Sequence, residues 1–312
     1  MPFDENSFVW INGGLTRHAE ALTQVSAHAL HYGTGVFEGI RCYETSEGPA
    51  LFRMDAHLDR LFASAAVYGM NMPYSREELT EATCEVIRKN GFTRCYVRPV
   101  CYLGTKTLGI GAKCPTEVAI LAVPDLGNVS NDVRAQGLRL MISSWTKIDR
   151  SMLPSTAKAS GQYLNSRLAS QEAVAQGYDE ALLLNAQGNI AEASVANVFL
   201  VKDGVVHTND ETSSILLGIT RDTAIQLAQE LGLPVKIGEI SVKQLHEADE
   251  VFLTGTAKEI VAVTEVDGCL VADGKRGKVS QRVQEAFAEA TSGHDAKHRH
   301  WLHLVTQPQP AH

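Results

Sequence analysis

Lys158 is the residue whose surroundings most suggest chemistry. It stands in the run STAKASG, residues 155–161, and no carboxylate lies one helical turn away from it. Small neighbours let a flat cofactor approach the backbone and leave the lysine amine free to act as a nucleophile. The alternative is that Lys158 is one of many surface lysines, and its spacing alone favours that alternative.

The common catalytic motifs are absent from the sequence. It contains no HExxH pair, no GxxxxGK[ST] loop and no GxSxG turn. Gly33 with Gly35 and Gly109 with Gly111 form GxG pairs, but neither continues to a third glycine at the spacing of a dinucleotide-binding turn. A dinucleotide site is therefore not expected.

Cysteine and histidine give no sign of a metal. The cysteines form no CxxC pair and no disulfide framework; they are Cys42, Cys84, Cys95, Cys101, Cys114 and Cys269. Free thiols in a chain of 312 residues indicate a reducing compartment, the cytoplasm. Histidines are scattered through the tail and are expected on the solvated surface, among them His294, His298, His300 and His303, so we predict no metal site.

Apolar spacing and capping signals predict five helices. They span residues 55–69, 75–90, 161–176, 220–231 and 279–291. The first is expected to begin behind Asp55 as N-cap. The second has Ser75 and Glu78 as a capping box and Gly91 as its end.

Strands and hairpins fill the spaces between these helices. Strands are expected near 95–103, 117–123, 138–145, 180–184, 197–202, 205–208 and 251–254, with turns at Asp203-Gly204 and Asp267-Gly268. Both halves mix helices with strands, which predicts an α/β chain of the α+β type with antiparallel or mixed sheets. The turn-rich stretch 125–136 is the expected linker between a domain over 1–124 and one over 137–312.

Composition narrows the class of partner. The net charge is −8 and the pI is near 5.8, with no basic patch of the kind that nucleic acid requires. No apolar stretch approaches the about 20 residues that span a bilayer, and the acidic N-terminus is unlike a secretory signal. We therefore expect small-molecule partners, with no nucleic acid and no membrane.

Four sequence blocks carry a family resemblance. They are SAHALHYGTGVFEGIRCYET (26–45), STAKASGQYLNS (155–166), EASVANVF with VHT and LLGITR (within 192–221), and ADEVFLTGTAKEI (248–260). With these blocks the chain resembles the class IV, fold type IV aminotransferases that use pyridoxal 5′-phosphate, and within them the branched-chain amino acid aminotransferases. The resemblance implies a fold like that of D-amino acid aminotransferase. It has a small N-terminal α/β domain, a larger C-terminal pseudo-barrel domain, and the cofactor between them.

The resemblance also implies that three residues contact the aldehyde, the ring nitrogen and the phenolic oxygen of the cofactor. Lys158 would form a Schiff base with the cofactor aldehyde and, once freed by substrate, move a proton. Glu192 would pair with the pyridine nitrogen and keep the ring protonated. Tyr163 would hydrogen-bond the phenolic oxygen. From residue type alone, Glu192 is equally a solvated hairpin residue and Tyr163 an ordinary helix tyrosine.

The phosphate is assigned by the same resemblance to Arg60 and two backbone turns. Ile219 and Thr220 would bind it at a helix start, where unpaired N–H groups favour anions. Gly255 and Thr256 would complete the phosphate site. Without the family pattern, Arg60 is equally a surface arginine on an amphipathic helix.

The substrate side is implied in the same way. It comprises Tyr32, Phe37, Gly39, Arg41, Tyr96, Arg98, Thr256 and Ala257, some of them near the active site across a dimer interface. Arg98 suits the distal carboxylate of 2-oxoglutarate or glutamate. An aromatic and aliphatic wall suits an apolar side chain. The alternative for Arg98 is a cross-strand ion pair.

Two departures from the family pattern bear on substrate range. The stretch DLGNVSND, residues 125–132, lacks the aromatic residues that cap the substrate pocket in many relatives. Ala196 stands where close relatives often carry a glutamate. We expect the core chemistry to survive both changes and the preference among side chains to differ.

The expected function is therefore branched-chain amino acid transamination. The amino group of L-leucine, L-isoleucine or L-valine would pass to 2-oxoglutarate by a ping-pong mechanism in branched-chain amino acid biosynthesis, in a cytoplasmic homodimer or higher homo-oligomer. Alternatives are D-amino acid transaminase, amine transaminase and aminodeoxychorismate lyase, against which the strand 96–98 and the first block speak. A non-catalytic cofactor-binding protein is disfavoured because Lys158 and Glu192 are both present.

Overall fold

The computed structural model describes residues 4–124 and 136–305, and the chain forms two compact units. Unit 1 comprises residues 1–126, 157–161 and 289–312, and unit 2 comprises residues 127–156 and 162–288. Residues 157–161 and 289–312 thus group with the N-terminal unit, whereas two consecutive domains were expected, since contacts between distant segments leave no local signal in the sequence. The expected linker, 125–136, lies outside the described residues apart from Gln136.

Unit 1 is built on an antiparallel sheet. Its elements are β1 (Phe8–Ile11), β2 (Gly14–Arg17), η1 (His18–Glu20), α1 (His28–Tyr32), β3 (Gly35–Phe37), β4 (Ile40–Thr45), β5 (Gly48–Phe52), α2 (Met54–Val67), α3 (Arg76–Asn90), β6 (Cys95–Leu103), β7 (Thr116–Val123), η4 (Arg299–Trp301) and β17 (Leu302–Leu304). The strand order is β17-β5-β4-β6-β7-β1-β2, and β3 also pairs with β6.

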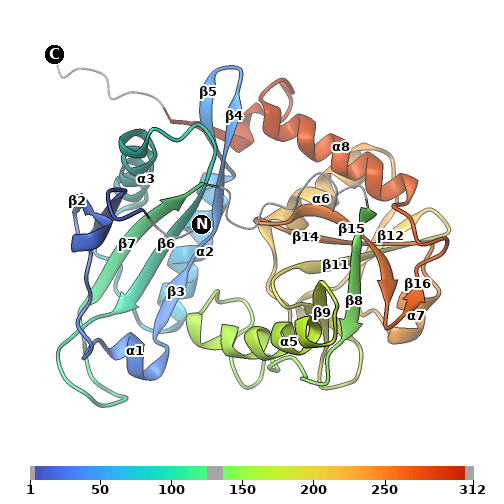
Figure 1. The fold of residues 1–312 in the computed structure, drawn as a ribbon, viewed down its shortest axis with the longest axis horizontal. Helices are drawn as coiled ribbons and strands as arrows, with labels where there is room; N and C mark the ends of the chain where they lie inside the picture. Colours follow the sequence, from blue (N-terminus) through green and yellow to red (C-terminus); the bar gives the residue numbers. More distant parts are fainter. Residues whose placement is uncertain (1–3, 125–135, 306–312) are drawn as a thin grey trace. The chain divides into compact units, whose positions relative to one another are not determined.

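Helices α2 and α3 cover one face of this sheet, and the main apolar core of the unit lies there (Figure 1). Strand β6 shows how the sequence divides the two faces. Val97 and Cys101 are fully buried in the core, so the alternating residues Tyr96, Arg98 and Val100 project from the opposite face. The opposite face therefore carries Tyr96 and Arg98, two of the residues that the family resemblance assigns to the substrate.

The two helix starts in unit 1 gave one correct and one wrong prediction. The Ser75–Glu78 capping box of α3 is confirmed, and Gly91 ends that helix in the left-handed conformation with φ 67°. The N-cap of α2 is Arg53 rather than Asp55, which lies in the first helical turn. Arg53 adopts φ 55°, and its N–H donates to the carbonyl of Trp301 at 2.6 Å, a long-range contact that fixes the start of the helix.

Unit 2 contains a nine-stranded mixed sheet. Its elements are β8 (Leu138–Ile142), η2 (Ser160–Gln162), α5 (Tyr163–Ala175), β9 (Glu180–Leu184), β10 (Ile190–Ala193), β11 (Asn197–Lys202), β12 (Val205–Thr208), η3 (Glu211–Ser213), α6 (Ile219–Glu230), β13 (Val235–Ile237), α7 (Val242–His246), β14 (Glu250–Gly255), β15 (Glu259–Val266), β16 (Cys269–Leu270) and α8 (Lys278–Ser292), of which η2 and α8 include residues of unit 1. The order is β10-β9-β8-β15-β14-β11-β12-β13, with β16 on β15.

The pairing in unit 2 confirms the expected mixed sheet. Strand β8 runs parallel to β9 and β15, and β12 runs parallel to β13, while the other pairs are antiparallel. The hairpin turn is present at Asp203 and Gly204, both at positive φ. Strand β8 ends at Ile142 rather than near 145, because the carboxylate of Glu172 binds the N–H of Ser144 and the hydroxyl of Ser143.

Three further expectations concern membrane spanning, metal binding and the histidines of the tail. None of the helices in the described part of the chain combines the length and apolar character needed to span a bilayer. The described residues contain no cluster of three or more side chains suited to a metal ion. In the tail, His298 is buried instead of solvated, because its ring stacks on Trp301 with centroids 4.1 Å apart.

Candidate active site

Lys158 is fixed from both sides by residues of unit 1. Its backbone N–H donates to Oγ of Ser64, a buried residue of α2, at 3.0 Å. Its carbonyl accepts the N–H of Phe37 at the end of β3, at 3.1 Å. The flanking Ala157 and Ala159 are buried, so the small residues around the lysine serve packing as well as access.

The amine of Lys158 lies in a positively charged environment. Nζ stands 5.2 Å from the ring centroid of Phe37. Removal from water and the charge of Arg60 lower the pKa of Lys158 to about 8; Arg98 acts in the same direction, and Glu38 opposes it. With such a pKa about one amine in ten is neutral at pH 7, against about one in 3,000 for an ordinary lysine. The neutral amine is the nucleophilic form.

Glu38 carries the counter-charge of this cluster. Its carboxylate is fully buried and accepts Nε of Arg60 at 2.6 Å and Nη2 at 2.9 Å, while Nδ1 of His57 lies 2.7 Å away. Burial raises the pKa of Glu38, but the charge of Arg60 and the bond to His57 outweigh it and hold the pKa far below its usual range. Burial lowers the pKa of His57, with Glu38 acting against it. Glu38 therefore orients the guanidinium of Arg60.

Arg98 is placed against an aromatic wall. Its guanidinium carbon lies 4.5 Å from the ring centroid of Phe37, and Nη2 donates to the hydroxyl of Tyr96 at 2.9 Å. The buried Nε of Arg98 has no hydrogen-bond partner among the described residues. Gly39 makes room for this arrangement, since a Cβ there would lie 1.8 Å from the Tyr96 hydroxyl oxygen. The guanidinium of Arg98 thus lies directly beside the aromatic rings of Phe37 and Tyr96.

Glu192, on β10, is the buried centre of a second cluster, within unit 2. Nζ of Lys147 lies 2.6 Å from its Oε1. Its Oε2 accepts Nδ2 of Asn197 at 3.1 Å and the backbone N–H of Leu216 at 3.2 Å. Both carboxylate oxygens are engaged, so the orientation of this side chain is fixed.

Asn197 connects Glu192 to the start of α6. Its Nδ2 also donates to the carbonyl of Leu216 at 2.8 Å. Gly218 is the N-cap of α6, and a Cβ there would lie 2.1 Å from Oδ1 of Asn197. Ile219 and Thr220 follow in the first helical turn, where backbone N–H groups lack partners within the helix. The sequence predicted a phosphate site at this turn.

Gly255, at the end of β14, lies close to the turn after β10. A Cβ on Gly255 would lie 3.2 Å from the carbonyl oxygen of Val195. A buried carboxylate ties the same two turns together: Oε2 of Glu180 lies 3.2 Å from Nζ of Lys258, and Oε1 accepts the hydroxyl of Ser194. Gly255 and Glu259 are paired in the sheet at the two ends of this loop, and Lys258 within the loop is tied to Glu180.

Five other predicted residues are placed by their elements. Tyr32 ends α1 and is 41% exposed, whereas Arg41 is buried on β4. Tyr163 is the first residue of α5 and is half-buried. Thr256 and Ala257 follow β14 and are half-buried as well. Their roles with substrate and cofactor stay predictions.

Three residues of these clusters are not among the predicted site residues. Glu38 stands inside the VFEGIR run, and His57 lies one helical turn before Arg60 on α2, so a search for charges around Arg60 could have found both. Lys147 is far from Glu192 in the chain and gave no signal. Each of the three belongs to the cluster around a predicted site residue: Glu38 binds Arg60, His57 binds Glu38, and Lys147 pairs with Glu192.

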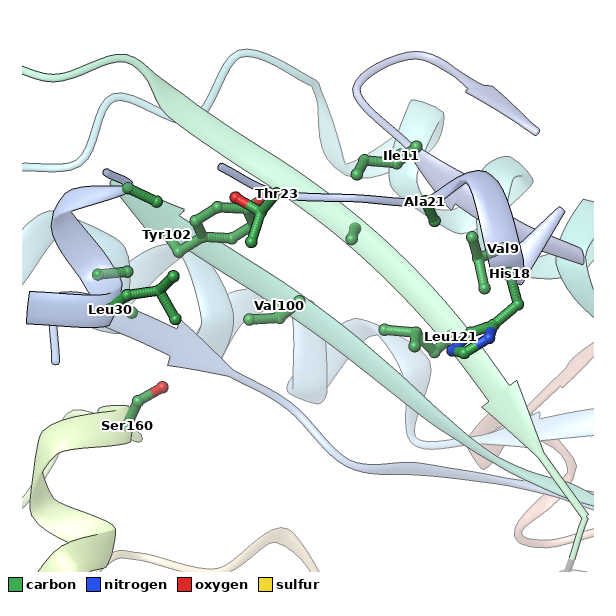
Figure 2. A pocket seen from close by; sticks show the side chains of 14 residues that line it. Val9, Ile11, His18, Ala21, Thr23, Leu30, Val100, Tyr102, Leu121 and Ser160 are labelled. Atoms are coloured by element: carbon green, nitrogen blue, oxygen red, sulfur yellow. The ribbon is translucent and has the colours of Figure 1, made fainter. Parts of the chain in front are cut away.

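An apolar hollow of about 410 Å³ lies on the open face of the unit 1 sheet. Figure 2 shows Val100 and Tyr102 of β6 and Leu121 of β7 projecting into it, with Leu30 of α1 and Ser160 at its side. The even-numbered residues of β6 place this hollow on the same face as Arg98.

Comparisons with known proteins agree with this geometry. The family described as amino-transferase class IV matches residues 35–266. A branched-chain-amino-acid aminotransferase of Escherichia coli (strain K12) is 43% identical over 98% of this chain and 100% of its own length. One from Pseudomonas aeruginosa is 40% identical over 97% and 98%.

Solved structures give the same result. The T.th. branched-chain amino acid aminotransferase with pyridoxamine 5′-phosphate has a TM-score of 0.94 at 43% identity, covering 96% of this chain and 99% of that one. The Escherichia coli enzyme has a TM-score of 0.94 at 43% identity, covering 96% and 100%. The expected fold, transaminase class and pyridoxal phosphate cofactor are confirmed. The chain belongs to the class IV aminotransferases.

Proposed function

We propose that this chain transfers the amino group of L-leucine, L-isoleucine or L-valine to 2-oxoglutarate, as its relatives' names suggest. The observation that carries the proposal is Arg98 lying 4.5 Å from the ring of Phe37. Both substrates must use one pocket, and this pairing offers a cation for the distal carboxylate of the acid and an apolar wall for the hydrocarbon. The T.th. enzyme has been solved with a phosphopyridoxyl-glutamate compound and with 4-methylvaleric acid, one ligand of each kind.

The side chains present fit pyridoxal phosphate. When bound, this cofactor supplies an electron-withdrawing ring that stabilises negative charge at the substrate Cα. Lys158 offers an amine of lowered pKa for its aldehyde, and Arg60 a guanidinium for its phosphate. In unit 2, the buried hydroxyl of Thr254 has no hydrogen-bond partner among the described residues, beside the predicted phosphate residue Gly255.

The remaining cofactor contacts in this proposal follow the sequence prediction. Glu192 would accept the N–H of the ring nitrogen, and Tyr163 would donate to the phenolic oxygen. The N–H groups of Ile219 and Thr220, with the loop that begins at Gly255 and Thr256, add to the phosphate site. The fixed orientation of Glu192 supports its assignment, since an acceptor for one ring N–H must be held in place.

Lys158 also moves the substrate proton in this account. Its Nζ would accept the proton from the substrate Cα and later give it back. A base whose pKa lies near the working pH can both accept and return a proton, and the pKa of about 8 suits this task. Burial contributes most to this lowered pKa, the charge of Arg60 lowers it further, and the charge of Glu38 opposes both.

A substrate panel with one matched pair of variants tests the proposal. We expect turnover with L-leucine, L-isoleucine and L-valine, and little with D-alanine. Arg98→Met should raise the KM for 2-oxoglutarate about 10–100-fold, because a charged hydrogen bond contributes about 1.5–3 kcal/mol, and should change the KM for L-leucine less. Arg94→Met, which removes an exposed arginine just before β6, is the control. Turnover of D-alanine without turnover of L-leucine would favour the other class IV activities.

We also propose that a second copy of this chain covers the open face of unit 1. Exposed apolar side chains gather in two loops beside the hollow, with Val25 84% exposed and Ile110 76% exposed. The two loops are joined, since Nε2 of His28 lies 3.0 Å from the carbonyl oxygen of Gly109. An exposed apolar surface of this kind marks an interface. The exposed Tyr32 lies in the same region and fits its predicted role across a dimer interface.

Sedimentation velocity tests this assembly. The wild type should sediment as a dimer or larger, and Ile110→Asp should shift it towards the monomer. Val174→Asp, at an exposed valine near the end of α5, should leave the assembly unchanged. A wild type that is monomeric at micromolar concentration would contradict the proposal.

A cytoplasmic location completes the proposed function. All six cysteines are free thiols, four of them buried. Unpaired cysteines of this number are typical of a reducing compartment. Fractionation of the source cells with an antibody against the chain tests the location.

A further inference from the structure

We propose that Lys147 is a positioning residue that fixes how Glu192 meets the cofactor ring, an inference that rests on the proposed function of Glu192. The ammonium nitrogen of Lys147 lies 2.6 Å from Oε1 of Glu192. Both side chains are about nine-tenths buried, with 11% and 9% of the side chain exposed. None of the sequence blocks that carry the family resemblance includes Lys147.

The backbone around Lys147 is itself held in place. Its N–H donates to the carbonyl of Leu184 on β9 at 2.8 Å. Asn165 of α5 brackets it: Nδ2 donates to the carbonyl of Thr146 at 3.0 Å, and Oδ1 accepts the N–H of Ile148 at 3.2 Å. A flexible lysine side chain therefore starts from a fixed point, between the helix that begins with Tyr163 and the strand next to β10.

The two carboxylate oxygens of Glu192 have different sets of donors. Oε2 accepts two donors, from Asn197 and from the backbone of Leu216. Oε1 accepts only Lys147 among the described interactions, so it is the oxygen with capacity for a further donor. A ring N–H would thus meet an oxygen whose direction the ammonium of Lys147 already fixes. Without Lys147, that oxygen loses its anchor among the described residues.

Stability alone is a weak reason for this pair. A buried ion pair repays the cost of removing two charges from water only partly, and apolar residues of similar size often stabilise a fold as well. The pair is useful where a buried carboxylate must stay charged and directed in order to bind a ligand. Lys147 fits that need, because it supplies one charge-assisted hydrogen bond to one chosen oxygen.

A double-mutant cycle on cofactor affinity tests the inference. The four proteins are the wild type, Lys147→Met, Glu192→Gln and the double variant, each stripped of cofactor and titrated with pyridoxal phosphate while the visible band is recorded. We expect Lys147→Met to weaken binding about 10-fold in the wild type and less than about 2-fold in the Glu192→Gln background, because contacting residues couple. The band of Lys147→Met should shift in the same direction as that of Glu192→Gln, and Lys147→Arg should restore both readouts.

One control variant and one alternative variant complete the experiment. Lys202→Met removes the exposed lysine pair with Asp249, at 2.9 Å in the same unit, and should leave affinity and band unchanged. If Lys147→Met does not fold, Asn165→Ala releases the segment without removing a charge and should weaken binding in the same coupled way. Equal effects in both backgrounds, or an unshifted band, would overturn the role of Lys147. The titration contains no amino acid, so failure of the substrate proposal appears separately, as a wild type that binds cofactor but ignores L-leucine.

Discussion

Gly39→Ala is the most informative single methyl that can be added to this chain. The new Cβ would lie 1.8 Å from the hydroxyl oxygen of Tyr96 and 2.6 Å from its Cζ. Tyr96 is only 5% exposed and holds Nη2 of Arg98, so it must move, and Arg98 then loses a partner. Overpacking of this kind costs about 1–3 kcal/mol of folding free energy. The lost orientation of Arg98 should raise the KM for 2-oxoglutarate by about 10-fold or more.

The assay compares this variant with Gly14→Ala. Gly14 lies on β2 of the same sheet, and a Cβ there would meet nothing within 4 Å. Steady-state kinetics with 2-oxoglutarate and L-leucine should show the KM effect mainly on the acid, and thermal melting should show a lower Tm for Gly39→Ala alone. An unchanged KM for 2-oxoglutarate, in a variant that has lost stability, would refute the reasoning that Tyr96 and Arg98 act together on the carboxylate.

Three other predictions concern the two clusters. In cofactor-free protein, the rate of pyridoxal phosphate capture should rise with pH, reach half its maximum near pH 8 and level off about one pH unit higher, because only the neutral amine of Lys158 reacts. Stopped-flow absorbance measures this rate, and a rate independent of pH would contradict the pKa of about 8. Glu38→Gln removes a negative charge that raises the pKa of Lys158, so the midpoint of that profile should move to lower pH, and a shift to higher pH would be the wrong sign. Gly218→Ala would place Cβ 2.1 Å from Oδ1 of Asn197 and should weaken cofactor binding in a fluorescence titration, whereas Gly238→Ala, with open space around it, should not.

The sequence predicted what is local. The capping box of α3 and the hairpin at Asp203-Gly204 depend on neighbouring residues, and both are present. The N-cap of α2 was wrong because a distant carbonyl, that of Trp301, fixes Arg53. Local signals cannot report such a contact.

The candidate site divides in the same way. The family resemblance assigned roles to Lys158, Arg60, Phe37, Tyr96 and Arg98, of which only Phe37 and Lys158 lie within the four sequence blocks, and the structure brings all five together in unit 1. The residues that orient these side chains and shift their pKa values were not predicted. The sequence does not show which charged group faces a buried carboxylate in the folded chain. Glu38 and Lys147 are of this kind: each is defined by a contact across the fold rather than by a motif.

An absorbance scan of the purified protein tests the central claim most directly. The visible band of bound pyridoxal phosphate should change to the aminated form when L-leucine is added and return when 2-oxoglutarate follows, and Lys158→Ala should lose this cycle. A wild-type band that L-leucine leaves unchanged, while another amino donor converts it, would contradict the assignment of a branched-chain amino acid aminotransferase.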